Sequence, residues 1–228
     1  ALREAITPRT KLVFVCNPNN PTGTYVGRAA VERFLQHLPA GVLVVFDEAY
    51  REYVEADDFP DTVAYVREGR PVFVLRTFSK IYGLAALRVG YAIGPASIVA
   101  NVLRVKEPFN VNALAQKAAL AALSDEEHVR RGRAVNREGM AYLSAELAGL
   151  GAQVWPSQAN FLWMDIGIDA KAVFQALLRR GVIVRTGDIF GFPTFLRVTV
   201  GTEAHNRRFI AALKEVLDEL RGSAEGRA

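Results

Sequence analysis

Three short, continuous apolar runs constrain the fold of this chain more than any other feature. They are KLVFVC at 11–16, GVLVVFD at 41–47 and PVFVLRTF at 71–78. Continuous rather than alternating apolar residues are typical of strands that are covered on both faces. The stretch RAAVERFLQHL at 28–38 repeats its apolar residues at helical spacing. Strand, helix and strand in this order predict an α/β layer around a mostly parallel sheet, with RVGYAIG at 88–94 as a fourth strand.

The pattern changes after residue 95. Helices are expected at ASIVANVLRV and ALAQKAALAAL, and Ser124 with Glu127 forms a capping-box signal for a long helix in which Gly132 and Gly139 are weak points. The segments AQVW, ANFLWMDI, GVIVR and FLRVTVG then read as short strands, with helices at 170–180 and 203–220. We therefore predict two domains: 1–124, the C-terminal part of a large α/β domain, and 125–228, a smaller α+β domain.

Charge and composition narrow the classes of partner. The net charge is +4, but the basic residues are scattered, which favours small anionic ligands over nucleic acid. The single cysteine, Cys16, excludes an internal disulfide and fits a reducing compartment. No apolar run is long enough to span a membrane. We expect a cytoplasmic protein that binds neither nucleic acid nor a membrane.

Polar residues follow each predicted strand of the first sheet. NPNNPTG at 17–23, DEAY at 47–50 and TFSK at 77–80 come directly after strands, and Arg88 begins the fourth. In an open α/β sheet, ligands bind beyond the carboxyl ends of the strands. These groups are therefore expected to share one edge.

Each group also has a plain structural interpretation. NPNNPTG contains the usual turn formers, Asp47 could cap the next helix, Lys80 could be solvated, and Arg88 could be an ion-pair partner. The hydroxyls of TFSK could bond their own backbone. The coincidence of four such groups at four strand ends favours a functional site over these separate explanations.

The combination suits one cofactor. A desolvated lysine amine is a Schiff-base nucleophile, and hydroxyls beside an arginine suit a phosphate, because arginine can bind two oxygens at once. A carboxylate on a neighbouring strand end would stabilise a positively charged ring nitrogen. An amine for a covalent bond, a phosphate-binding set and a carboxylate for the ring nitrogen are the three contacts by which a protein holds pyridoxal 5′-phosphate.

The motifs CNPNNPTG, DEAY, TFSK followed by LRVG, and FLRVTVG, in this order, resemble those of the fold-type I pyridoxal-phosphate aminotransferases. The similarity runs from about residue 6 to 220 and is nearest to the histidinol-phosphate branch. It implies a partial pyridoxal-phosphate-binding large domain, a smaller C-terminal domain, and a homodimer. It also implies transfer between an amino donor and a 2-oxo acid acceptor in histidine biosynthesis.

The resemblance assigns roles around the cofactor ring. Lys80 would bond the cofactor covalently and then move the proton to and from the substrate α-carbon. Asp47 would pair with the pyridinium nitrogen, and Asn20 and Tyr50 would hydrogen-bond the phenolic oxygen. Lys80, Asp47 and Tyr50 are thus the expected catalytic residues.

Further roles concern the two anionic groups. The cofactor phosphate is expected on Thr77, Ser79 and Arg88. Arg197 is expected to bind an anionic group of the substrate, with Asn20, Arg185 and Phe109 as further substrate-pocket residues. No metal ligand is expected, because the three histidines lie far apart without ligand spacing.

Alternatives share these motifs. They are a threonine-phosphate decarboxylase-like lyase, an aminotransferase for aromatic or other amino acids, and a non-catalytic aminotransferase-like module of a regulator. In the family, a segment before the first motif supplies part of the cofactor site. The chain begins just ahead of that motif, so we expect the 228-residue chain alone to be weakly active or inactive.

Overall fold

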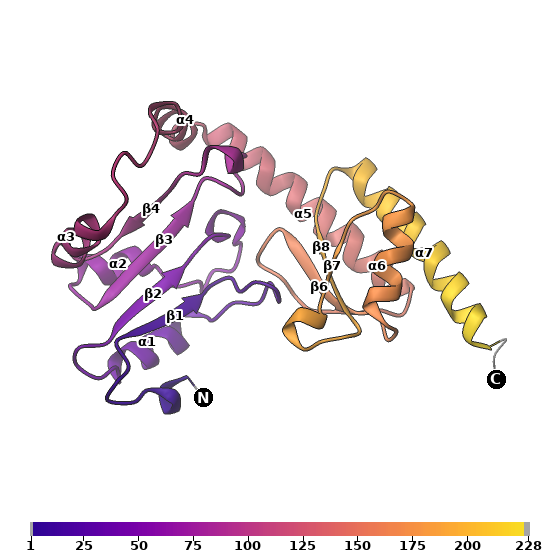
Figure 1. The fold of residues 1–228 in the computed structure, drawn as a ribbon, viewed down its shortest axis with the longest axis horizontal. Helices are drawn as coiled ribbons and strands as arrows, with labels where there is room; N and C mark the ends of the chain where they lie inside the picture. The colour runs from indigo at the N-terminus through magenta and orange to yellow at the C-terminus, as the bar shows by residue number, and fades with distance from the viewer. Residues whose placement is uncertain (1, 226–228) are drawn as a thin grey trace. The chain divides into compact units, whose positions relative to one another are not determined.

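The structure is a computed structural model of the chain that describes residues 2–225, with side chains described as far as residue 222. The chain divides into two compact units (Figure 1). Unit 1 comprises 1–20 and 24–130, and unit 2 comprises 21–23 and 131–228. The division falls within one long helix, whereas the predicted domains divide at residue 124, ahead of that helix. The domain assignment itself stays a prediction.

Unit 1 is built on a four-stranded sheet of order β1-β2-β3-β4. Its strands are β1 (Leu12–Cys16), β2 (Leu43–Asp47), β3 (Val72–Thr77) and β4 (Gly90–Ile93). The first three are parallel, and β4 runs antiparallel to β3. The predicted α/β layer with a mostly parallel sheet is confirmed.

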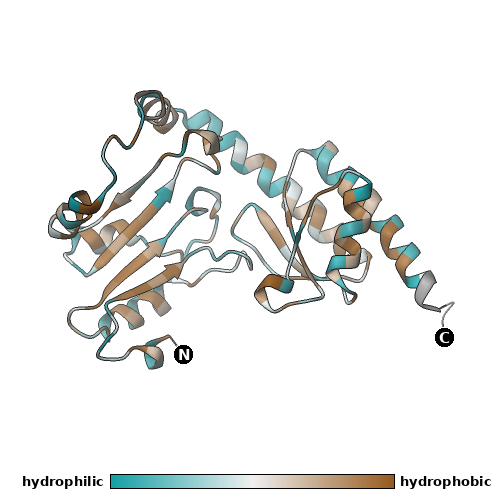
Figure 2. Ribbon diagram, in the orientation of Figure 1, coloured by the Kyte–Doolittle hydropathy of each residue, from teal (hydrophilic) through white to brown (hydrophobic). Residues whose placement is uncertain are grey.

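Helices α1 (Arg28–Gln36) and α2 (Thr62–Arg67) make the crossovers between the parallel strands. They cover one face of the sheet (Figure 1), and the residues of its strands are mostly hydrophobic (Figure 2). The buried residues of this layer are Val31, Val44, Phe46, Tyr65, Val72 and Val74. Because α2 has only six residues, its apolar period is too short to read in the sequence.

Three short 3-10 turns and two further helices also belong to unit 1. The turns are η1 (Arg3–Ala5), η2 (Arg51–Tyr53) and η3 (Ala85–Leu87). Helices α3 (Ala96–Val105) and α4 (Ala113–Leu123) have the predicted bounds. A second small core joins α4 to the loop after β3 and the start of β4. It consists of Phe78, Val89, Ala115 and Ala119.

Helix α5 (Glu126–Gly149) begins in unit 1 and continues into unit 2. Its helical hydrogen bonding runs unbroken past Gly139, which the sequence marked as a weak point. A Cβ at Gly139 would lie 2.4 Å from Val200 Cγ1 and 2.7 Å from Asn206 Nδ2. The glycine is therefore a packing contact that lets the start of the last helix approach α5 closely.

Unit 2 contains an antiparallel sheet of order β5-β6-β8-β7. Its strands are β5 (Gln153–Val154), β6 (Phe161–Asp165), β7 (Arg185–Thr186) and β8 (Phe195–Thr199). One face packs against α5, α6 (Ala170–Arg179) and α7 (Glu203–Glu225), and η4 (Asp188–Phe190) lies between β7 and β8. The predicted α+β alternation is confirmed for the residues of this unit.

One predicted strand is mostly wrong. The segment GVIVR at 181–185 forms a strand only from Arg185. The amides of Gly181 and Val182 bond to the carbonyls of Leu178 and Leu177 instead. They therefore end α6, and Gly181 has a positive φ of 71° there.

Among residues 2–225, none of the helices combines the length and apolarity that crossing a membrane requires.

Candidate functional site

The parallel strands bring their carboxyl ends to one edge of the unit 1 sheet. Cys16 pairs with Asp47, and Asp47 pairs with Leu75, so β1 and β2 end together while β3 continues to Thr77 at the same edge. Thr77 pairs with Gly90, which places the start of β4 at the same edge. This register is the reason that residues far apart in sequence meet there.

A cavity of about 420 Å³ opens at this edge. That volume falls within the range of roughly 300–1,000 Å³ that small-ligand sites occupy. Its lining consists of Asp47, Ala49, Leu75, Arg76, Thr77, Ser79, Lys80, Ala85 and Arg88. Five of the residues singled out in the sequence therefore surround one space: a carboxylate, two hydroxyls, an amine and a guanidinium.

Local hydrogen bonds hold the strand ends in shape. Asp47 Oδ1 accepts from the amide of Ala49 at 3.2 Å. Thr77 Oγ1 accepts from the amide of Ser79 at 3.0 Å. The bond of Thr77 is the one that the plain interpretation expected, whereas Asp47 does not cap the next helical turn, whose N-cap is Tyr50. Both side chains still line the cavity. The two roles are compatible, because each oxygen has further capacity to accept.

Lys80 lies over the ring of Tyr50, with Nζ 5.2 Å from the ring centroid. Tyr50 is buried, so it forms a fixed wall beside the amine. The loop that carries Lys80 is held at its far side by His128 on α5, whose Nε2 donates to the carbonyl of Ile81 at 2.8 Å. The carbonyl of Lys80 accepts from the amide of Gly83.

Arg88 has an unusual backbone conformation. Its φ of 52° and ψ of 49° lie in the left-handed region, where residues other than glycine are uncommon. Its Nη1 donates to the carbonyl of Ala85 at 2.7 Å. Backbone strain of this kind is frequent at binding sites, where surrounding contacts maintain it.

Sequence reasoning missed two residues at this edge, Arg76 and Glu48. Arg76 lines the cavity and pairs with Glu48, which is fully buried. Burial raises the pKa of Glu48, against the hydrogen bond from Thr62 and the charge of Arg76. Burial alone would lower the pKa of the Arg76 guanidinium. The neighbouring Glu48 and Tyr91 have a larger, opposite effect, so the pKa of Arg76 is raised. The sequence signal that could have indicated Arg76 is a single arginine within an otherwise apolar strand.

The structure does not bring the other predicted residues into this lining. Asn20 lies in the loop after β1, and Phe109 lies between α3 and α4 and is 97% exposed. Arg185 and Arg197 belong to unit 2, where they are register partners on β7 and β8. The guanidinium of Arg197 lies 5.1 Å from the centroid of the Phe161 ring. Tyr50 is outside the lining as well, and the roles of all the predicted site residues stay predictions.

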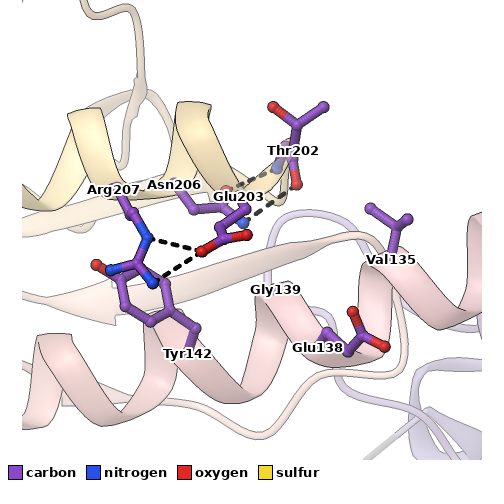
Figure 3. Close-up of a pocket in the computed structure, with 9 residues that line it drawn as sticks. Val135, Glu138, Gly139, Tyr142, Thr202, Glu203, Asn206 and Arg207 are labelled. Carbon is purple, nitrogen blue, oxygen red and sulfur yellow. Dashed lines mark hydrogen bonds and ion pairs between the residues drawn. The ribbon is translucent and has the colours of Figure 1, made fainter.

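A second cavity, of about 310 Å³, lies within unit 2 between α5 and the start of α7 (Figure 3). Arg207 bonds to Glu203 and lies over the ring of Tyr142, as the figure shows. Asn206 bonds in both directions to the backbone of Gly201. The polar groups of this second cavity thus bond largely to one another. None of the site residues predicted from the sequence lines it.

The described residues contain no group of three or more histidine, cysteine, aspartate or glutamate side chains placed to hold a metal ion.

Comparison with known proteins identifies aminotransferases as the relatives of this chain. The model of the family "Aminotransferase class I and II" matches residues 1–213. Over 218 residues, the chain is 59% identical to a histidinol-phosphate aminotransferase of Moorella thermoacetica, covering 95% of this chain and 56% of that protein. The chain thus spans little more than half the length of this relative.

Solved structures give the same result. The histidinol-phosphate aminotransferase of Sinorhizobium meliloti, in complex with pyridoxal-5′-phosphate, is 29% identical with a TM-score of 0.86, over 92% of this chain and 58% of that one. An L-threonine-O-3-phosphate decarboxylase of Porphyromonas gingivalis is 25% identical with a TM-score of 0.81, over 94% and 67%. The fold is that of the fold-type I enzymes.

Proposed function

The chain belongs to the class I and II aminotransferase family, and from that premise we propose that it supplies the lysine-bearing part of a pyridoxal 5′-phosphate site in a histidinol-phosphate aminotransferase. The observation that carries the proposal is the cavity at the strand ends of unit 1. Its lining includes Asp47, Thr77, Ser79, Lys80 and Arg88. Bound there, the cofactor supplies an electron-accepting ring for amino transfer.

The residues present fit this cofactor. Lys80 is the only amine in the lining, so its Nζ would hold the cofactor covalently and carry the proton that moves at the substrate α-carbon. Asp47 would face the ring nitrogen and keep it protonated. Tyr50 lies beside the amine, where its hydroxyl, with Asn20, would bond the phenolic oxygen of the ring.

The phosphate would lie at the end of β3. Ser79 and Thr77 offer hydroxyls, and Arg88 offers a permanent positive charge with two parallel donors. The backbone of the loop is already closed by the bond from Ser79 to Thr77, so little ordering is needed on binding. A lysine could not replace Arg88 without losing the two-pronged contact.

The substrate assignment rests on the relatives. The 59% identity is to a histidinol-phosphate aminotransferase, whereas the decarboxylase of similar fold is 25% identical. Arg197, Arg185 and Phe109 are the proposed substrate-pocket residues, with Asn20. The two arginines on paired strands supply positive charge suited to a phosphorylated or carboxylated substrate. Glutamate and 2-oxoglutarate would be the second pair of reactants.

We also propose a homodimer in the cytoplasm. A single cysteine fits a reducing compartment, and unit 1 exposes many apolar side chains on α3 and α4. Sedimentation of the purified protein would measure its oligomeric state.

The test of this function is an amino-transfer assay with histidinol phosphate and 2-oxoglutarate. It is run on the 228-residue chain and on a chimera that adds the part of the Moorella relative outside the matched region. We expect glutamate formation by the chimera, little by the chain alone, and none by the chimera with Lys80→Ala. Release of carbon dioxide from threonine phosphate without glutamate formation would instead establish the lyase.

A further inference from the structure

Glu48 is a buried acidic residue to which the proposed chemistry gives no role. It follows Asp47 directly, yet its side chain is fully buried. Thr62 on α2 donates its hydroxyl hydrogen to Oε1 at 2.6 Å. Arg76 on β3 contacts Oε2 twice, through Nε at 2.9 Å and Nη2 at 2.8 Å. Both carboxylate oxygens are therefore occupied.

Arg76 connects this buried carboxylate to the rest of the sheet. It pairs in register with Tyr91 on β4, and this neighbour helps to raise the pKa of Arg76. At the same time it lines the cavity, one residue before Thr77. Arg76 thus lies beside β4, binds the segment after β2 through its guanidinium, and lines the cavity.

The network joins the elements that carry the cavity residues. Asp47 ends β2, the Thr77–Lys80 segment follows β3, and Arg88 precedes β4. The amide of Glu48 also bonds to the carbonyl of Leu75 at 2.9 Å, which extends the β2–β3 pairing past the end of β2. Any change in the Glu48–Arg76 separation would shift these strand ends against each other.

We propose that the Glu48–Arg76 ion pair is a positioning device for the cofactor cavity, holding Asp47 in place relative to the segment that carries Thr77, Ser79 and Lys80. This inference rests on the proposed function, because it concerns the same site. Neither residue is a catalytic residue in this account. They act through the strand ends that they join.

The choice of charged residues supports this role. A buried ion pair is often no more stabilising than apolar residues of the same volume, because burying two charges is costly. An apolar pair, however, would tolerate sliding, whereas a carboxylate bonded by three fixed donors accepts one arrangement. The pair therefore restricts geometry at the place where the site needs it.

The test compares Glu48→Gln with a matched control, Glu32→Gln. Glu32 pairs with Arg70, which lies just ahead of β3, at the opposite end from the cavity. Both variants lose one carboxylate charge from an ion pair in unit 1. The measurements are absorbance titration with pyridoxal 5′-phosphate, trapping of the Lys80 adduct with borohydride, and thermal unfolding. Titrations are done below the unfolding range of every variant.

For Glu48→Gln we expect pyridoxal 5′-phosphate binding to weaken roughly 10-fold or more, with a matching fall in trapped Lys80 adduct. For Glu32→Gln we expect less than a 2-fold change, whatever its unfolding temperature. Adding Arg76→Gln to Glu48→Gln should not weaken binding further, since the two residues act as one unit. The proposal would be overturned if Glu48→Gln and Glu32→Gln weakened cofactor binding equally. It would also be overturned if Glu48→Gln bound the cofactor as tightly as the wild-type protein.

A second variant keeps the test decisive if Glu48→Gln does not fold. Thr62→Val removes only the hydroxyl that donates to Glu48 and keeps the shape of the side chain. We expect about 2- to 5-fold weaker binding, and no change would count against the inference. Absence of any Lys80 adduct in the wild-type protein would contradict the proposed function itself and with it this inference.

Discussion

Unit 1 and unit 2 keep their apolar side chains in different places. Unit 2 has one continuous core shared by its sheet and three helices. In unit 1 the buried apolar residues form two smaller clusters, and large apolar side chains stand exposed on β1, α3 and α4, among them Phe14, Leu103 and Leu114. Yet unit 1 carries the candidate site. Hydrophobic packing dominates unit 2, whereas the cavity of unit 1 depends on polar contacts between strand ends.

The largest expected effect breaks the core of unit 2. Leu213 on α7 is fully buried, so Leu213→Ala should lower the free energy of unfolding of unit 2 by about 2–5 kcal/mol. Leu103 on α3 is 60% exposed in the single chain, so Leu103→Ala should change the stability of the monomeric chain by no more than about 0.5 kcal/mol. Both tryptophans, Trp155 and Trp163, lie in unit 2, so fluorescence during urea unfolding measures the effect of Leu213→Ala. Amide hydrogen exchange in β2 and β3 measures the effect of Leu103→Ala in unit 1.

The contrast between the units would fail if Leu103→Ala proved as costly as Leu213→Ala. A loss that occurs only at concentrations at which the chain self-associates would instead support the proposed dimer.

A smaller effect is expected at the contact between α5 and α7. Gly139→Ala places a methyl group 2.4 Å from Val200, which should cost about 1–3 kcal/mol of unit 2 stability. Gly149 lies on the same helix with nothing within 4 Å of a Cβ, so Gly149→Ala is the matched control and should cause no loss. Tryptophan fluorescence again reads the transition, and equal losses from both variants would refute the packing role of Gly139.

The smallest effect is a pH dependence of unit 1. Burial raises the pKa of Glu48, so the folded state holds this proton to higher pH than the unfolded state. The stability contribution of Glu48 is therefore fully present below the ordinary glutamate pKa of about 4.3, and it is lost as pH rises through the raised value. The slope for one such group is at most about 1.4 kcal/mol per pH unit.

Amide hydrogen exchange in β2 and β3 measures this slope, and Glu48→Gln should remove it. Glu32 should give a pH dependence of stability with the opposite sign, because the hydrogen bond from Arg70 lowers the pKa of Glu32. Its contribution is present above the ordinary pKa and is lost as pH falls. An unchanged slope in Glu48→Gln would show that another group causes the pH dependence.

Much of the fold follows from local sequence signals. Continuous apolar runs identify β1, β2 and β3, and helical spacing identifies α3 and α4 with their observed bounds. The meeting of Asp47, Lys80 and Arg88 at one edge follows because parallel strands end together. The spacing of apolar residues is sufficient to predict these helices and strands, and the parallel order of the strands is sufficient to predict where the polar residues meet.

Other features depend on tertiary contacts that no local pattern encodes. In DEAY, the first carboxylate lines the cavity while the second is buried, and only the position of Arg76 on the neighbouring strand explains the difference. The segment 181–185 has the composition of a strand, but its first amides complete the end of α6. Gly139 reads as a helix weakness until the approach of α7 is known.

We propose that unit 1 holds pyridoxal 5′-phosphate through Lys80. All six lysines of the chain are exposed, so exposure alone would give comparable labelling of each. The direct measurement is borohydride reduction over a range of pyridoxal 5′-phosphate concentrations, followed by peptide mapping. We predict labelling of Lys80 at least roughly 10-fold ahead of the other five, reduced by inorganic phosphate. Even labelling of all six lysines, or labelling centred on another one, would contradict the account.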